Sequence, residues 1–377
     1  MAATPRANPR ESMNHCQVEA HRKPFPQDQW SVGGGLHSED NEDHYREERH
    51  FFEWWYFDIA FNDGSWLVAV LHSALYCMGN HRPAIDLRYY PTKGPPVEVF
   101  RSFSRSEYET TLGRFKIRID KSWAASEKGI FRLHLYQGPL EAKLTFHPKL
   151  SGVKVGGGHL FADSFKKKYF NWVVPVPKAF VEGTLRVHGE TRLVEGVGYH
   201  DHNWGNIYLP NAFRGWVWGR VWGGKHTLVF GDLIPQDGTP NVTPLLLGCD
   251  GKVRVISDGF QLRWDDITTD TIIDTNELCK LFLEDKGNQD ISLSLTLKKP
   301  METAKIAALY SWLVPLRRLV EPLFYLTQKI PMLGQLIGLF VGKGLYYRYQ
   351  AQGVLRIADE VTEVQGLVEK MVLKSGI

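Results

Sequence analysis

Short runs of alternating apolar and polar residues, separated by turn residues, recur along most of this 377-residue chain. Alternation with a period of two is typical of β-strands that bury one face. The strongest example joins Phe51–Ala60 to Trp66–His72 across the sequence Asn62-Asp63-Gly64, and it predicts a β-hairpin. Further short runs at 97–103, 130–135 and 140–146 have a spacing that suits a sandwich or barrel and leaves no room for crossover helices.

Two prolines mark a place where the chain divides. Pro175 and Pro177 predict a semi-rigid connection, so we place a domain boundary near 176–181. The resulting prediction is an irregular N-terminal arm at 1–47, an N-terminal β-domain at 48–178 and a C-terminal β-domain at 179–377. The fold class is therefore predicted to be all-β, with two β-barrel or sandwich domains in tandem.

The segment 301–344 breaks the β-pattern. It is rich in Leu, is interrupted by proline, and predicts a helical amphipathic insertion in the second domain. No uninterrupted apolar run reaches the ~18–20 residues that span a bilayer. Two interpretations stay open: helices that lie on a membrane surface, or a helical cap packed against the barrel.

Composition excludes some classes of protein. With 45 basic and 42 acidic residues the net charge is only +3, so we expect no nucleic-acid partner. The four cysteines are far apart and lack CxxC spacing, so neither a zinc ribbon nor a disulfide framework is expected. The polar N-terminus has no secretory pattern, and the expected location is the cytoplasm.

Polar groups that are costly to bury are concentrated in one stretch, Val194-Glu195-Gly196-Val197-Gly198-Tyr199-His200-Asp201-His202-Asn203-Trp204-Gly205. Its apolar start and the lack of helical spacing predict a strand. Side chains alternate between the two faces of a strand. One face should carry Tyr199, Asp201 and Asn203, and the other should carry His200, His202 and Trp204.

Two other aromatic stretches contain charged residues. Glu53 and Asp58 lie within the aromatic strand 51–60, where each carboxylate is expected to pair with an arginine or to cap a turn. In 213–222, alternation places Trp216, Trp218 and Trp222 on one face together with Arg214 and Arg220. These arginines would satisfy buried carboxylates such as Asp201 or Glu53, or stack on the indoles.

The stretches Glu53-Trp54-Trp55-Tyr56-Phe57-Asp58 and 198–205 together resemble the carotenoid 1,2-hydratase-like superfamily of tandem lipocalin-like proteins, over roughly residues 50–300. The resemblance implies two lipocalin-like β-domains with a ligand site between them. The superfamily includes hydratases that add water to acyclic carotenoids, single-chain cyclases that resemble class II terpene cyclases, and, more distantly, decalin-forming pericyclases. The insertion 301–344 departs from the common pattern and leaves the substrate subgroup open.

Hydration and class II cyclisation both begin with protonation of an alkene, which needs a strong acid that is neutral before it reacts. Burial keeps a carboxyl group protonated, and a nearby cation favours the carboxylate as it forms. Asp201 is the first candidate acid, with His200 and His202 as neighbouring imidazoles and Tyr199 as a group that orients the acid or carries a proton. Asp58 is the second candidate acid.

A carbocation also needs aromatic faces that stabilise it without ending the reaction. The candidate substrate-binding residues are Trp54, Trp55, Trp172, Asn203, Trp204, Trp216, Trp218 and Arg214. We expect no cofactor and no metal. The alternatives are a metal site formed by His200 and His202 with His226 or Glu195, and a purely structural network around Asp201 and Asn203.

The chain is therefore expected to be an enzyme that protonates an alkene of a long polyprenylated substrate and cyclises the resulting cation. Three alternatives stay open: a carotenoid 1,2-hydratase, a pericyclase of the same fold, and a non-catalytic lipid or isoprenoid carrier. The expected partner is an apolar isoprenoid small molecule, with peripheral membrane contact through 301–344.

Overall fold

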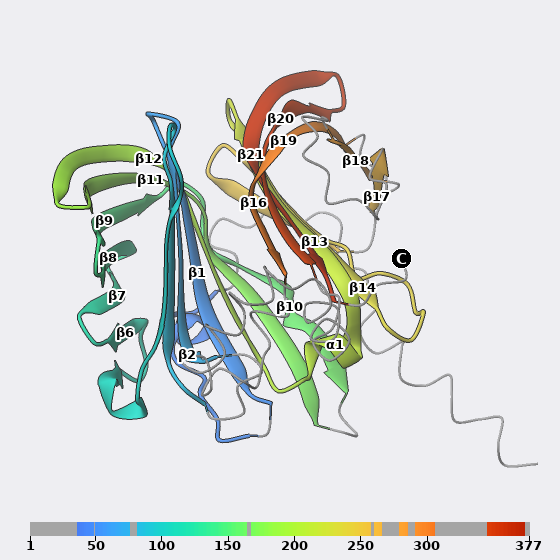
Figure 1. The fold of residues 1–377 in the computed structure, drawn as a ribbon. Helices are drawn as coiled ribbons and strands as arrows, with labels where there is room; N and C mark the ends of the chain where they lie inside the picture. The colour runs from blue at the N-terminus through green and yellow to red at the C-terminus, as the bar shows by residue number, and fades with distance from the viewer. Residues whose placement is uncertain are drawn as a thin grey trace, which may run out of the picture.

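The computed structural model describes residues 36–48, 50–75, 81–163, 167–257, 260–265, 279–285, 291–305 and 345–373. Within these ranges the chain is almost entirely antiparallel β-strand, which confirms the predicted all-β class (Figure 1). The short helical elements of the described residues are two 3-10 turns and one α-helix: η2 (Ser38–Asn41), η3 (Arg105–Glu107) and α1 (Leu209–Ala212).

The first sheet has twelve strands in the order β4-β3-β2-β1-β12-β11-β9-β8-β7-β6-β5, with β10 paired to β11 off this path. Its strands are β1 (Phe52–Phe61), β2 (Trp66–Ala74), β3 (Ala84–Tyr90), β4 (Val97–Ser102), β5 (Tyr108–Thr110), β6 (Lys116–Ile119), β7 (Ser122–Glu127), β8 (Ile130–Gln137), β9 (Leu140–Pro148), β10 (Val153–Asp163), β11 (Lys168–Val187) and β12 (Glu190–Gly205).

The second sheet has nine strands in the order β16-β15-β14-β13-β21-β20-β19-β18-β17. Its strands are β13 (Phe213–Gly223), β14 (His226–Pro235), β15 (Pro244–Cys249), β16 (Lys252–Ser257), β17 (Phe260–Asp265), β18 (Cys279–Asp285), β19 (Ile291–Lys305), β20 (Leu345–Ile357) and β21 (Glu360–Val372).

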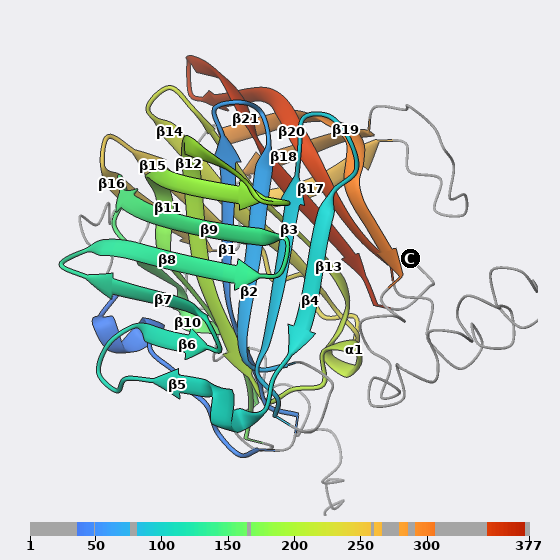
Figure 2. The same ribbon diagram turned by 60° about the vertical axis from the view of Figure 1, so that its left-hand side comes forward.

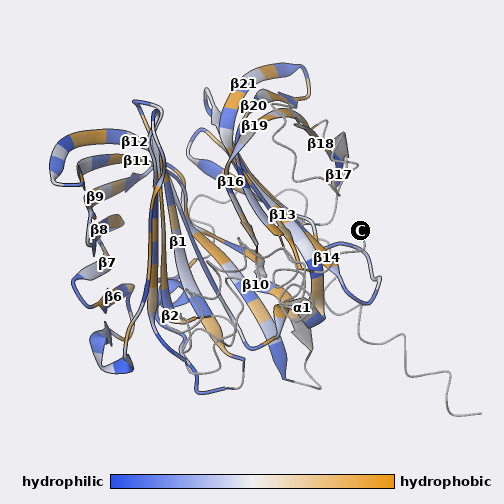
Figure 3. Cartoon of the chain, in the orientation of Figure 1, coloured by the Kyte–Doolittle hydropathy of each residue, from blue (hydrophilic) through white to orange (hydrophobic). Residues whose placement is uncertain are grey.

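Each sheet curls around its own apolar core, which is the lipocalin-like arrangement. In Figure 2 the strands β5–β9 cross the direction of β1–β4. Side chains from both groups meet in one cluster that includes Phe57, Leu87 and Leu133. The inner face of the second sheet forms a separate cluster that includes Phe230 and Leu295. Apolar and polar residues alternate along the strands that build these cores (Figure 3).

A third apolar layer lies between the two sheets. It joins residues of the first sheet, such as Tyr56 and Tyr199, to residues of the second sheet, such as Trp222 and Leu367. Figure 1 shows the outward face of β1 turned toward β13 and β21. The long strands β1, β12, β13 and β21 therefore each have one face in a domain core and the other in this inter-sheet layer.

The predicted hairpin is confirmed. β1 and β2 are antiparallel neighbours, and Gly64 adopts φ +86° in the turn between them. Asp63 stabilises this turn because its Oδ1 accepts hydrogen bonds from the main-chain N (2.9 Å) and Oγ (2.6 Å) of Ser65.

The sheets divide at a different point from the predicted boundary, which falls inside β11. Pro175 and Pro177 do not end this strand. Both lie where the register of β11 with β12 is irregular, because it shifts between Val173 and Val176 and again between Val176 and Ala179. Proline is tolerated where a strand has such irregularities. β12 consequently belongs to the first sheet, and the second sheet begins at β13.

The helical interpretation of 301–344 is wrong for its first five residues. Residues 301–305 continue β19 and pair with β20, where Ala304 faces Tyr346 in the register. The strand persists because it pairs with β20 on both sides of two register shifts near Pro300. The remainder of the predicted insertion lies outside the described residues. Among the described helices, none is long and apolar enough to cross a membrane.

Candidate functional site

The two predicted motif strands, β1 and β12, are antiparallel neighbours. Their register places Tyr56 opposite Asp201 and Asp58 opposite Tyr199. Tyr56 and Tyr199 belong to the inter-sheet layer, whereas Phe57 lies in the first domain core and stacks on His200. The predicted alternation of β12 is thereby confirmed, and the Asp201 face points toward the second sheet.

Asp201 is a buried carboxyl group, 5% exposed, whose hydrogen-bond donors are all neutral. Its Oδ2 accepts from Oη of Tyr199 (2.9 Å) and from Nε1 of Trp172 (3.1 Å). Its Oδ1 accepts from Nδ2 of Asn203 (2.9 Å). Sequence analysis anticipated all three residues, and the structure brings them together around one carboxyl group.

The pKa of Asp201 is raised to about 8, chiefly because burial penalises the charged form. The negative charges of Glu369 and Asp58 act in the same direction, and the hydrogen bonds from Tyr199 and Trp172 oppose it. Asp201 is therefore mostly protonated at neutral pH, and its donors stabilise the carboxylate once the proton leaves.

Aromatic rings surround this acid. The indole of Trp218 lies 5.2 Å from the ring of Tyr199 and 5.5 Å from that of Tyr56, measured between ring centroids. Burial and the Asp201 charge hold the pKa of Tyr199 well above its usual range, so its phenol stays neutral. The result is a set of electron-rich ring faces next to a neutral acid.

Asp58, the second candidate acid, forms a buried ion pair. Both of its oxygens accept hydrogen bonds from Nε of Arg220, at 2.7 and 2.9 Å, and Nη2 of Arg220 contacts Asp58 as well. Asp58 and Arg220 are each 0% exposed. The predicted pairing of Asp58 with an arginine is confirmed. Arg220 binds Asp58 rather than Asp201 or Glu53, and its guanidinium also lies 4.4 Å from the ring centroid of Trp222, which confirms the alternative of stacking on an indole.

His200 and His202 occupy the opposite face of β12, inside the first domain. Nδ1 of His200 donates to the main-chain oxygen of Tyr56 (2.9 Å), and Nε2 accepts from Nδ2 of Asn41 (3.0 Å). Nε2 of His202 contacts Oε1 of Glu53 (3.1 Å). Burial lowers the pKa of each histidine to about 3.

Both imidazoles are therefore neutral, and the expected imidazolium next to Asp201 is wrong. The reason is geometric, since consecutive residues on a strand point to opposite faces. The alternative metal site also fails geometrically: Glu195 is exposed on β12, while His226 faces Glu360 in the second sheet (3.1 Å). Among the described residues, no group of three or more His, Cys, Asp or Glu side chains is arranged to hold a metal ion.

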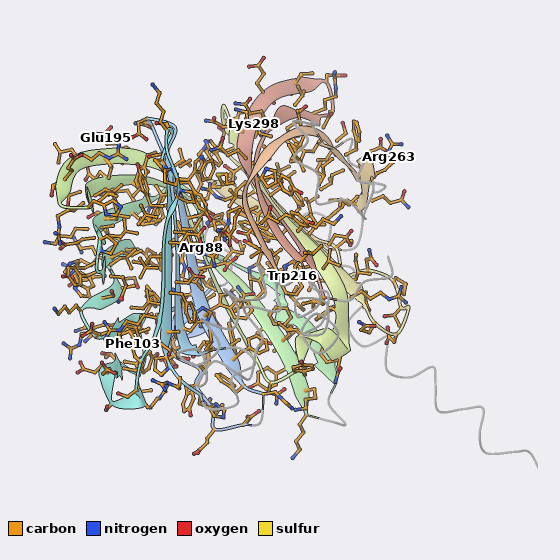
Figure 4. The ribbon with its side chains drawn as sticks, viewed as in Figure 1. Arg88, Phe103, Glu195, Trp216, Arg263 and Lys298 are labelled. Atoms are coloured by element: carbon orange, nitrogen blue, oxygen red, sulfur yellow. The ribbon has the colours of Figure 1, made fainter. Side chains whose placement is uncertain are left out.

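The predicted tryptophans separate into two environments. Trp54, Trp172 and Trp218 pack in the inter-sheet layer, and Trp216 packs against a neighbouring cluster that contains Phe213. Figure 4 labels Trp216 on the second sheet and Arg88 between the two sheets.

Trp55 and Trp204 lie on the histidine side instead, away from Asp201. Trp55 stacks on His202 at 4.5 Å, and Trp204 stacks on His44 at 4.0 Å. Arg214 contributes its main-chain oxygen to a 2.7 Å bond from N of Leu373, and the arginine that reaches the β1 face is Arg220.

Sequence reasoning missed a buried polar network that crosses between the sheets. Oη of Tyr56 donates to Oε1 of Glu369 (2.9 Å), and Nε of Arg348 donates to the same oxygen (2.8 Å). Nη1 of Arg348 also donates to Oη of Tyr90 (2.6 Å) and to Oε2 of Glu302 (2.5 Å). The available signal was a charged residue inside an aromatic strand, such as Arg348 within Tyr346-Tyr347-Arg348-Tyr349.

Part of this chain is similar in sequence to known proteins. Residues 163–266, which include the Asp201 motif, match the family described as carotenoid hydratase CrtC. The quinolone epoxide rearrangement protein asqO of Emericella nidulans is 36% identical over 114 residues, covering 24% of this chain and 31% of that protein. The hydroxyneurosporene dehydrogenase of Chlorobaculum tepidum is 37% identical over 135 residues, covering 34% of this chain and 32% of that protein. The match thus spans about a third of the length of each relative.

Two solved structures have a similar fold over nearly the whole chain. CghA is 12% identical with a TM-score of 0.59, covering 94% of this chain and 98% of its own. Kievitone hydratase from Nectria haematococca is 13% identical with a TM-score of 0.55, covering 93% of this chain and 98% of its own. At these identities the likeness concerns the fold alone.

Proposed function

Residues 163–266 match a carotenoid hydratase family and the chain has a lipocalin-like fold. From that premise we propose that it is an enzyme that protonates an alkene of a long polyprenylated substrate and cyclises the resulting carbocation. The observation that carries this proposal is the environment of Asp201. A carboxyl group with a pKa of about 8 is held by Tyr199, Trp172 and Asn203, next to aromatic rings, and none of the described residues bonds a cation to it.

The proposed first step is proton transfer from Asp201 to one alkene carbon. The alkene π electrons form the new C–H bond, the other carbon becomes a tertiary cation, and Asp201 becomes a carboxylate. The three neutral donors then stabilise that carboxylate without the cost of moving a second charge. In the apolar layer the acid remains protonated until substrate is present, which matches the need for a neutral but competent acid.

The cation would next be stabilised by the rings of Trp218, Tyr199 and Tyr56. Cation–π attraction contributes ~2 kcal/mol or more in a desolvated site. A second alkene of the same substrate then attacks the cation, which closes a ring. Because these aromatic groups are weak nucleophiles, they would guide the cation without trapping it.

Hydration of a carotenoid alkene is the second candidate, and the match of residues 163–266 to a carotenoid hydratase family favours it. It shares the Asp201 step and differs in the fate of the cation, which water would capture. An apolar isoprenoid substrate is proposed in either case.

The test is to incubate purified protein with polyprenylated aromatic and acyclic carotenoid substrates in D₂O and to analyse the products by mass spectrometry. A cyclase yields an isomer that contains one deuterium, and a hydratase adds water. We expect Asp201→Asn to lower turnover by ~10²-fold or more while the protein stays folded.

A matched control is Asp232→Asn. Asp232 is also a buried carboxyl group, 7% exposed, but it lies on β14 and is bonded by Nδ2 of Asn241 (2.7 Å). It should retain activity. Equal activity of Asp201→Asn and wild type would rule out the proposed acid, and conversion without deuterium uptake would favour a pericyclic reaction.

A further inference from the structure

A second tyrosine–carboxyl pair lies beside the first. Tyr56 is the register partner of Asp201 on the neighbouring strand, and such partners have Cβ atoms ~5 Å apart on one face. Its hydroxyl bonds to Glu369 of β21, a residue of the other sheet. Because Tyr56 and Tyr199 both contact the indole of Trp218, the two pairs border the same aromatic surface.

Glu369 differs from Asp201 in being paired with a cation. Arg348 binds Glu369 at 2.8 Å and also binds Glu302 at 2.5 Å. Glu302 forms a further ion pair with Arg88, which in turn binds Asp86 at 2.8 Å. Two guanidinium groups thus compensate three carboxylates. Glu369 therefore shares the Arg348 guanidinium with Glu302.

The two carboxyl groups therefore have different hydrogen-bond partners. Asp201 is bonded by three neutral donors, and Glu369 is bonded by the guanidinium of Arg348. Paired groups whose environments separate them in this way are typical of an acid and a base that act in one reaction.

We propose that Tyr56, supported by Glu369, removes the proton that ends the reaction. This inference rests on the proposed cyclisation. The oxygen of Tyr56 takes a proton from the carbon next to the final cation, and the electrons of that C–H bond form the new C=C bond. The hydroxyl proton of Tyr56 passes at the same time to Glu369. Exchange with water then returns Glu369 to the carboxylate and Asp201 to the acid.

The two transfers must be concerted. Burial and the charge of Glu369 hold the pKa of Tyr56 well above its usual range, so the phenolate does not form on its own. The phenol is the group that faces the aromatic surface, so Tyr56 is the catalytic group and Glu369 acts through it.

The experiment compares Tyr56→Phe and Glu369→Gln with wild type in the D₂O assay. We expect kcat to fall by ~10²-fold or more with KM changed by less than ~3-fold. The cation should also persist until water captures it, so the fraction of hydroxylated product should rise. Glu369→Asp, which keeps the carboxylate, should recover part of kcat.

Tyr90→Phe is the matched control. It removes a phenol oxygen from the same network, at the Arg348 and Glu302 end. It should lower stability without changing the product mixture. If Tyr56→Phe lowers the melting temperature yet keeps wild-type kcat and products, the pair is structural and the inference is overturned. If wild type makes no deuterated cyclic product, the proposed cyclisation itself fails.

Discussion

Replacing Arg220 with methionine should lower the free energy of unfolding by an amount that depends on pH. The change leaves Asp58 fully buried without its cation. Removing one partner of a buried ion pair costs ~3–5 kcal/mol. The folded variant limits this loss by protonating Asp58, since a neutral carboxyl group is cheaper to bury than a carboxylate.

The cost of protonating Asp58 sets the size of the loss in unfolding free energy. An unfolded aspartate ionises near pH 3.9, and each pH unit above that value costs ~1.4 kcal/mol to hold the proton. The expected loss of unfolding free energy is therefore ~4 kcal/mol at pH 7 and ~1.5 kcal/mol at pH 5. The sign follows from a folded pKa raised above the unfolded one, so the penalty grows as pH rises.

Equilibrium urea unfolding at pH 5, 6 and 7 measures this dependence. The double variant Asp58→Asn/Arg220→Met has no carboxylate at this position, so its stability relative to wild type should change little with pH. An Arg220→Met loss that is the same at pH 5 and pH 7 would refute the assignment of Asp58 as the uncompensated charge. So would a double variant less stable than Arg220→Met at pH 7.

Two further predictions concern pH and membranes. Unfolding free energy should be nearly level from about pH 4.5 to 6.5 and should fall on both sides. Within this range two effects oppose each other. Histidines with pKa values lowered to about 3 or 4 bind protons on unfolding, so they favour the folded state as pH rises, whereas carboxyl groups with pKa values raised to about 7 or 8 release protons on unfolding and have the opposite effect. Below about pH 4.5 the unfolded carboxyl groups are protonated as well, so only the histidine effect remains, and above about pH 6.5 the unfolded histidines are neutral, so only the carboxyl effect remains. Denaturation between pH 3 and 8.5 tests this, and a rise in stability from pH 6.5 to 8 would contradict it. The amphipathic sequence that follows Lys305 predicts that the protein co-sediments with liposomes and that serine at Leu336, Leu339 and Phe340 releases it; wild-type protein that stays in the supernatant would contradict the membrane interpretation.

Local sequence was sufficient for the strands and for the faces of the central motif. The period of two in 194–205 depends only on backbone geometry, so the separation of Asp201 from His200 and His202 could be derived from the chain. The turn at Asn62-Asp63-Gly64 is equally local, because its glycine and aspartate determine the conformation themselves.

Other features were decided by contacts between distant segments. Tyr56 and Glu369 are 313 residues apart, and Asp58 and Arg220 are 162 apart. No local periodicity encodes which strand of the second sheet lies against β1. The neutral state of the histidines has the same origin, since it follows from burial in the first domain rather than from neighbouring residues. Side-chain identity and strand geometry thus follow from the chain alone, whereas charge state and partner follow from the packing of one sheet against the other.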